Sequence, residues 1–105
     1  MSTTLQLGTY PVMGGQYADF SNLRNSHVKE MEGEYVDFVL EPDNRYDSNA
    51  IILMFHEKKM GYVPKTINSI LLFLLEQADR CIVYGRISKI DTGKQLIQIS
   101  YSLEV

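Results

Sequence analysis

The sequence predicts a small, mainly β domain, either a six-stranded barrel or a strongly curled sheet, with one or two helices. Three observations lead to this prediction. Short apolar runs alternate with period two, turn-forming residues separate the runs, and only one stretch shows convincing helical spacing. With 105 residues, 45% apolar and 22% charged, the composition is that of a folded chain rather than a disordered one, and we expect residues 1–105 to form one domain.

The first third of the chain holds two predicted strands and an ambiguous segment between them. The first strand is expected over residues 5–13, where two glycines end the run. Residues 18–32 fit either a short helix or a long polar loop. The second strand is expected over residues 34–41, because alternate residues from Val36 to Leu40 are apolar and would share one face.

The middle of the chain is expected to form a hairpin followed by a helix. Residues 50–55 are apolar on both faces, which is typical of a strand covered on both sides. A polar tip separates them from the returning strand, residues 59–63. Residues 66–78 follow the i, i+3, i+4, i+7 rule of an amphipathic helix, with Asn68 or Thr66 available to cap it.

The last third is expected to form a second hairpin. Residues 82–90 and 95–103 flank a turn that contains a glycine, and Ile97, Ile99 and Tyr101 lie on one face of the final strand. The single cysteine, Cys81, precedes this hairpin and is expected to be a small buried hydrophobe. One cysteine allows neither an internal disulfide nor a thiolate zinc cluster.

The predicted helix carries two large apolar residues away from its core-facing stripe. On a helical wheel, Leu72 and Phe73 fall in the polar arc with Asn68, Ser69 and Glu76. Exposed apolar groups of this size usually mark a contact. The expectation is a homodimer through Leu72 and Phe73, with a cover formed by residues 18–32 as the alternative.

Charge and hydropathy narrow the classes of partner. The net charge of −3 counts against strong nonspecific binding to nucleic acid, which depends on Lys and Arg at phosphates. It leaves room for a small site that takes one or two nucleotides. No signal peptide is apparent, and the longest apolar run is too short to span a bilayer, so no membrane partner and a cytoplasmic location are expected.

Metal-dependent and cofactor-dependent chemistries find little support. Asp43, Glu57 and Lys59 loosely match the pattern of metal-dependent nucleases, in which two carboxylates hold a divalent cation. The match is poor, because Glu57 and Lys59 fall at a predicted hairpin tip. Calcium and zinc sites lack the required ligand spacing, and no glycine-rich phosphate loop is present. We therefore expect no cofactor, no metal and no enzymatic activity.

The most informative segment is the polar run 41–50 between two apolar strands. Its proline, asparagines and aspartates are turn formers. A connecting turn does not require Arg45 or Tyr46, and an aromatic side chain held in a hydrogen-bonded turn is suited to contact a ligand. This loop is therefore the first place to look for a binding site.

Three blocks of the sequence, in order, resemble the HIRAN domain. They are Gly14-Gly15-Gln16-Tyr17, then Glu41-Pro42-x-Asn44-x-Tyr46-Asp47-x-Asn49-Ala50, and finally Gly61-Tyr62-Val63-Pro64-Lys65 at the start of the helix. The resemblance implies an OB-like barrel of about six strands with two helices. Some members capture the 3′-hydroxyl end of single-stranded DNA within fork-remodelling helicases. Others are stand-alone bacterial or phage proteins, the type that this chain resembles.

The resemblance also implies roles for individual residues. Tyr17 and Tyr46 would stack on terminal bases, Asp47 would accept a hydrogen bond from the sugar hydroxyl, and Lys65 would meet phosphate, with Asn44 supporting the loop. Two positions depart from the DNA-binding members: Gln16 replaces an arginine, and Tyr62 stands where histidine occurs.

Structural roles remain open for the same residues. Tyr46 would then pack over the end of the barrel, Asn44 and Asp47 would only form turns, Tyr62 would belong to the core or rim, and Lys65 would be a solvated lysine. At the level of function, the alternative is a protein-interaction or structural module on the same fold.

Overall fold

The structure, a computed structural model, describes residues 3–14 and 26–105. Six antiparallel strands form a sheet in the order β1-β6-β5-β2-β3-β4. The elements are β1 (Thr4–Pro11), the 3₁₀ helix η2 (Ser26–Met31), β2 (Tyr35–Leu40), β3 (Ile51–Phe55), β4 (Lys58–Tyr62), α1 (Lys65–Leu75), β5 (Ile82–Asp91) and β6 (Leu96–Glu104). The prediction of six strands in a mainly β fold is confirmed, with bounds that differ by a few residues.

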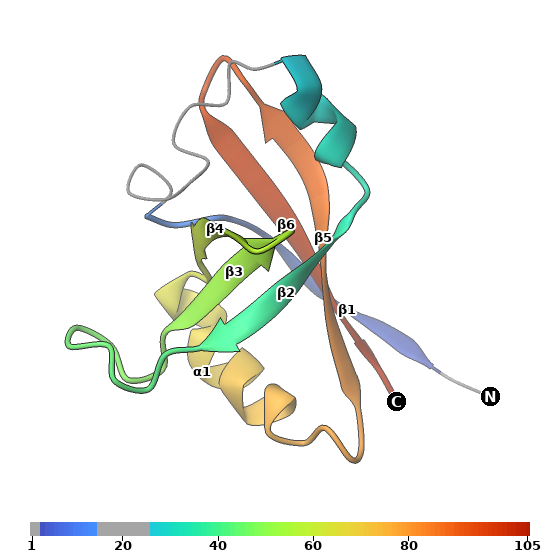
Figure 1. The fold of residues 1–105 in the computed structure, drawn as a ribbon. Helices are drawn as coiled ribbons and strands as arrows, with labels where there is room; N and C mark the ends of the chain where they lie inside the picture. Colours follow the sequence, from blue (N-terminus) through green and yellow to red (C-terminus); the bar gives the residue numbers. More distant parts are fainter. Residues whose placement is uncertain (1–2, 15–25) are drawn as a thin grey trace.

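The sheet is strongly curled because β2 passes from one half of it to the other. Tyr35 and Val36 pair with β5, whereas residues 37–40 pair with β3. The long strands β1, β5 and β6 are therefore crossed by the shorter β2, β3 and β4 (Figure 1). At the far edges, Met13 and Tyr62 exchange backbone hydrogen bonds of 2.9 and 2.8 Å in an isolated bridge. This bridge joins the two edges at one point, and the sheet is not a closed barrel in the described residues.

The hydrophobic core lies inside the curl. The predicted inner face of the last strand is confirmed, since Ile97, Ile99 and Tyr101 are all buried. In β2 the alternation places Val36 in the core, but Leu40 is largely exposed where the strand runs out into the following loop. The remaining core is contributed by the other strands and the helix, through Ile51, Leu53, Met60, Val63, Leu71, Ile87 and Ile90.

Helix α1 lies at one end of the molecule and η2 at the other, beside the β5–β6 turn (Figure 1). The helix begins at Lys65 and ends at Leu75, before the predicted end at residue 78, and no side chain caps its N-terminus. The capping role predicted for Asn68 or Thr66 is therefore wrong. No helix in residues 3–14 and 26–105 is long and apolar enough to cross a bilayer.

The buried face of α1 differs from the predicted one. Asn68 is only 4% exposed, and Leu72 packs against the core, so placing both in a polar arc was wrong. The buried stripe centres on Leu71. It can include Asn68 because the side-chain amide of Asn68 donates a hydrogen bond to Asp47 in the 41–50 loop. Of the two residues expected to be exposed, Phe73 is exposed by 62%, and Ile70, one turn earlier, lies on the same side.

Two further predictions, for segment 18–32 and for Cys81, can be compared with the structure. The end of the ambiguous segment 18–32 forms η2, while residues 18–25 lie outside the described part. Cys81 is half-buried just before β5, and its sulfur lies 3.6 Å from the carbonyl oxygen of Leu74 and 3.7 Å from that of Gln77. These contacts fit a packed thiol at the end of the helical segment.

Candidate functional site

The loop 41–50 between β2 and β3 is organised around one asparagine. The Asn44 Oδ1 atom accepts hydrogen bonds from the backbone N–H groups of Tyr46 (2.9 Å) and Asp47 (3.0 Å). Its Nδ2 atom donates to Glu41 Oε1 over 2.6 Å. The backbone N–H of Glu41 bonds to the carbonyl of Ala50 and closes the base of the loop. Asn44 therefore fixes the backbone that carries Tyr46 and Asp47.

Asp47 connects this loop to α1. Its Oδ1 accepts from the backbone N–H of Asn49 (2.9 Å), and its Oδ2 accepts from Asn68 Nδ2 (2.7 Å). These two hydrogen bonds, followed by the charge of Lys65, hold the pKa of the Asp47 carboxyl below its ordinary value. Each carboxylate oxygen can still accept a further hydrogen bond, because it has two lone pairs. Asp47 is thus an ionised, oriented acceptor with spare capacity.

The ring of Tyr46 projects into solvent. It is 83% exposed, although Asn44 holds its backbone in place. The alternative in which Tyr46 packs over the end of the barrel is therefore wrong. A large ring on a fixed backbone is available to stack on a flat ligand at low cost in conformational entropy.

Tyr62 sits at the end of β4, and its hydroxyl makes hydrogen bonds to two side chains. The hydroxyl donates to Glu41 Oε1 (2.9 Å) and lies 3.0 Å from Lys59 Nζ, which donates to it. The Lys59 ammonium also lies 4.5 Å from the centroid of the Tyr62 ring. Hydrogen bonds from Asn44 and Tyr62, and then the charge of Lys59, lower the pKa of Glu41. Glu41 therefore ties the loop to β4, and Lys59 brings a positive charge beside Tyr62.

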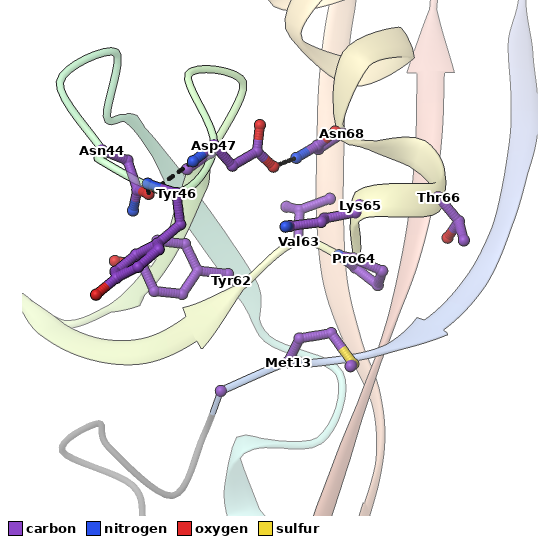
Figure 2. Close-up of a pocket in the computed structure, with 12 residues that line it drawn as sticks. Met13, Asn44, Tyr46, Asp47, Tyr62, Val63, Pro64, Lys65, Thr66 and Asn68 are labelled. Atoms are coloured by element: carbon purple, nitrogen blue, oxygen red, sulfur yellow. Dashed lines mark hydrogen bonds between the residues drawn. The ribbon is translucent and has the colours of Figure 1, made fainter.

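The predicted site residues within the described chain meet in one open pocket of about 480 Å³. It is lined by Met13, Gly14, Asn44, Tyr46, Asp47, Ala50, Tyr62, Val63, Pro64, Lys65, Thr66 and Asn68. Figure 2 shows the loop side chains on one side and those at the start of α1 on the other. Segments far apart in sequence thus build a single cavity. The predicted Gln16 and Tyr17 lie outside the described residues.

Sequence reasoning missed four side chains at or beside this pocket. Met13 lines the pocket because its bridge to Tyr62 brings the segment that follows β1 to the cavity. Asn68 had a usable signal, since asparagine is a poor helix former and this one lies in mid-helix beside apolar neighbours. Glu41 and Lys59 carried no local signal for their shared contact with Tyr62, which depends on how β4 packs beside the loop.

The three residues that loosely match the nuclease pattern, Asp43, Glu57 and Lys59, do not form a metal site within the described part of the chain. His56 and Glu57 both have positive φ angles, 50° and 67°, and form the tight turn between β3 and β4. Lys59 is directed to the Tyr62 hydroxyl. Within residues 3–14 and 26–105, no three His, Cys, Asp or Glu side chains are grouped so as to bind a metal ion.

We compared the sequence and the fold with those of known proteins. The chain is similar over 99% of its length to a protein of Lactobacillus plantarum whose crystal structure is known, with a TM-score of 0.76, 25% identity and 98% of that chain covered. It is similar in fold to the HIRAN domain of human HLTF, with a TM-score of 0.69 and 17% identity, covering 96% of this chain and 78% of that one. No curated protein matches the sequence. The HIRAN domain model matches residues 6–104, and the chain therefore belongs to the HIRAN domain family.

Proposed function

We propose that this HIRAN domain is a non-catalytic module that binds single-stranded DNA and takes its 3′ end into the pocket between the 41–50 loop and α1. One observation carries the proposal. Five residues that the family resemblance places at the DNA site, either in contact with DNA or supporting the loop, all line this single pocket: Asn44, Tyr46, Asp47, Tyr62 and Lys65. Residues 6–104 match the HIRAN domain model, and the resemblance to that family implies that some of its members capture DNA ends.

The aromatic residues of the pocket suit unpaired bases. Tyr46 offers an exposed ring, and Tyr62 a ring whose orientation is set by Glu41 and Lys59. Base–aromatic stacking contributes about 1–3 kcal/mol per base and does not require a particular base. We therefore expect weak sequence preference, with Tyr46 contributing more than Tyr62 because its ring is more accessible.

The polar residues suit a free sugar hydroxyl followed by phosphate. The ionised Asp47 would accept a hydrogen bond from the terminal 3′-hydroxyl through a free lone pair. Lys65 and the N-terminus of α1, which no side chain caps, would attract the phosphate of the preceding linkage. A terminal phosphate would instead meet the carboxylate and be repelled.

The direct test compares three labelled oligonucleotides by fluorescence anisotropy: one with a free 3′-hydroxyl, one with a 3′-phosphate, and one with a 5′-phosphate. The last two carry the same charge and differ only in its position. We expect the 3′-phosphate to weaken binding about five- to tenfold, because a charge-assisted hydrogen bond is replaced by repulsion. The 5′-phosphate should have little effect. Equal binding of all three would reject end recognition.

The rival function is a peptide-binding or structural module on the same fold. The net charge of −3 and the exposed Tyr46 favour it, because an aromatic rim can hold a peptide as well as a base. A salt titration separates the two functions, since phosphate contacts give a linear fall of log K with log salt. Incubating the oligonucleotide with magnesium or manganese tests the non-catalytic assignment, and the DNA should remain uncut.

The proposal also includes a homodimer and a cytoplasmic location. The homodimer expected from the sequence is retained with Phe73 and Ile70 as its contact, because Leu72 belongs to the core. Both side chains project from the solvent side of α1. A cytoplasmic location, as expected from the sequence, is testable by cell fractionation.

A further inference from the structure

A second groove lies on the outer face of the sheet, away from the loop and helix. It crosses β1, β6, β5 and the start of β2, has a volume of about 490 Å³, and shares no residue with the first pocket. Its floor is polar and is formed mainly by short side chains, through Thr4, Gln6, Ser88, Ser100 and Ser102. An outer sheet face is normally only solvated. Here the short side chains leave a hollow between longer ones at its rim.

Strand register sets the order of groups in this groove. Tyr35 pairs with Arg86, and Arg86 pairs with Ser100, which gives one row across three neighbouring strands. Gln6 pairs with Ser102 in the next row. An aromatic ring, a guanidinium and several hydroxyl and amide groups therefore face the same space.

Arg86 is held in place and retains free donors. Its Nε donates to the carbonyl of Gly33 over 2.8 Å, and its guanidinium lies 5.9 Å from the centroid of the Tyr35 ring. Gly33 has a φ of +94°, a conformation that favours glycine and that presents its carbonyl to Arg86. The two Nη groups make no hydrogen bond or ion pair with any described residue. A fixed guanidinium with unused donors is suited to bind an anion bidentately.

The rim adds a stacking surface. Tyr35 is 60% exposed, and its ring centroid lies 5.8 Å from that of Tyr84 on the neighbouring strand. Among the groove residues, Arg86 is the single side chain charged at neutral pH. In a protein with a net charge of −3, this is a local site for a negatively charged ligand that also carries flat groups and hydroxyl-bonding atoms.

We propose that this groove binds the sugar-phosphate backbone of a nucleic-acid strand at a position away from its 3′ end, with phosphate at Arg86 and a base against Tyr35. The proposal takes its ligand class from the proposed function. Strand β1 links the two sites, since Thr4 and Gln6 at its start lie in the groove and Met13, two residues after its end, lies in the first pocket. At about 3.3 Å per residue, the two ends of β1 lie about 25 Å apart, so the groove would contact nucleotides remote from the end.

The experiment uses the full chain and a single-stranded oligonucleotide of about 12 nucleotides, with either a free or a phosphorylated 3′ end. Arg86→Ala should weaken binding of both forms about fivefold and reduce the slope of log K against log salt by about 0.7, the loss of one phosphate contact on a single strand. Arg80→Ala is the control, since it removes the same charge from an exposed position outside the groove.

A second pair of variants does not disturb the Arg86–Gly33 contact. Ser102→Glu places a carboxylate in the groove and should weaken binding, whereas Ser102→Gln, of similar size and uncharged, should not. Thermal melting would verify that all four variants fold. If Arg86→Ala and Ser102→Glu bind as wild type does while Tyr46→Ala binds weakly, the groove inference is overturned and the proposed function survives. If binding depends on Arg86 but ignores the state of the 3′ end, the groove inference holds and end recognition fails.

Discussion

At the residue scale, the most consequential side chain is Asp47, because it both builds the loop and faces the pocket. Its Oδ1 closes a turn on Asn49, which is the structural role expected of an aspartate in such a loop. Its Oδ2 bonds to Asn68, a contact that a turn does not require. These two hydrogen bonds hold the carboxylate at the cavity and leave lone pairs on both oxygens for a ligand.

Substitutions at Asp47 and Tyr46 should therefore have different effects. Asp47→Asn should reduce discrimination between 3′-hydroxyl and 3′-phosphate ends but keep the fold, because asparagine still forms the turn and a rotated Asn68 amide can meet it. Tyr46→Ala should weaken the binding of both oligonucleotides equally, by about 1–3 kcal/mol, because it removes a ring on which a base stacks. Anisotropy titrations with both oligonucleotides measure the two effects. Parallel losses in the two variants would contradict the separate roles.

Tyr101 offers a test of the core. It is fully buried, its hydroxyl has no hydrogen-bond partner among the described residues, and burial raises the pKa of the phenol. Tyr101→Phe should stabilise the protein by about 1–2 kcal/mol, because an unsatisfied buried hydroxyl is removed while the ring contact with Phe38 remains. Tyr101→Leu should destabilise it, since that ring is lost. Urea unfolding measures both. A less stable phenylalanine variant would mean that the hydroxyl has a partner.

At the element scale, the pocket exists because α1 is attached to the 41–50 loop at its first turns. Pro64 has an extended conformation, with φ −59° and ψ 145°, and the helix starts directly after it. Asn68, one turn later, reaches Asp47 over 2.7 Å. A polar residue in the buried stripe of a helix lowers helix propensity, so its presence is explained by the contact with the loop.

Removing this link should loosen the loop. Asn68→Ala should destabilise the protein by about 1–2 kcal/mol, because a buried hydrogen bond to a charged group is lost. It should also weaken discrimination between 3′ ends, since Asp47 loses its second anchor. Ser69→Ala, at the next and exposed position of the helix, is the matched control and should change neither property. Chemical unfolding and anisotropy titration together measure the outcome. Unchanged discrimination in Asn68→Ala would show that the Asn49 contact alone orients Asp47.

At the scale of the whole molecule, several carboxylates act as acceptors that hold separate segments together. Glu32 accepts from the backbone of Ile90, and Glu41 accepts from Asn44 and Tyr62. Together with Asp47 and Asp91, these groups all have a pKa held below its ordinary value. In each case the largest cause of the lowered pKa is a hydrogen bond, from backbone or from a side chain, rather than an ion pair.

This pattern predicts how stability depends on pH. A carboxyl group with a lowered pKa in the folded state stabilises the fold above its unfolded pKa, and this stabilisation is lost as the pH falls through the folded value. The melting temperature should therefore be nearly constant from pH 8 to about 5 and should fall below about pH 4.5. Glu41→Gln should lower the melting temperature at pH 7 and make its fall in acid shallower. A melting temperature that rises on acidification would contradict the assignment.

The exposed apolar side of α1 predicts self-association. Phe73→Ser should shift the protein toward the monomer if Phe73 and Ile70 form the contact, because the apolar area buried between two copies would be lost. Leu5→Ser, at another exposed apolar position in β1, is the control. Light scattering over a range of concentrations measures the mass. A monomeric wild-type protein at high concentration would reject the dimer.

Local sequence patterns predicted most of the secondary structure and the two main segments of the pocket, the 41–50 loop and the start of the helix. Period-two alternation predicted strands such as 34–41 and 95–103, because a half-buried strand must place every second residue inside, as Ile97, Ile99 and Tyr101 are. The turn chemistry of Asn44 and Asp47 was also readable, because an asparagine or aspartate bonds to backbone within a few residues of itself.

Contacts between residues that are distant in sequence depend on the folded arrangement and could not be read from local patterns. The bridge from Met13 to Tyr62, the contact from Asn68 to Asp47 and the pairing of Arg86 with Tyr35 each join segments more than ten residues apart. The buried face of α1 also depends on its neighbours in the fold. A helical wheel considers the helix alone and placed Leu72 on the solvent side, whereas in the structure Leu72 packs against the core. Local periodicity describes one element at a time, whereas burial depends on the neighbours that the fold brings against it.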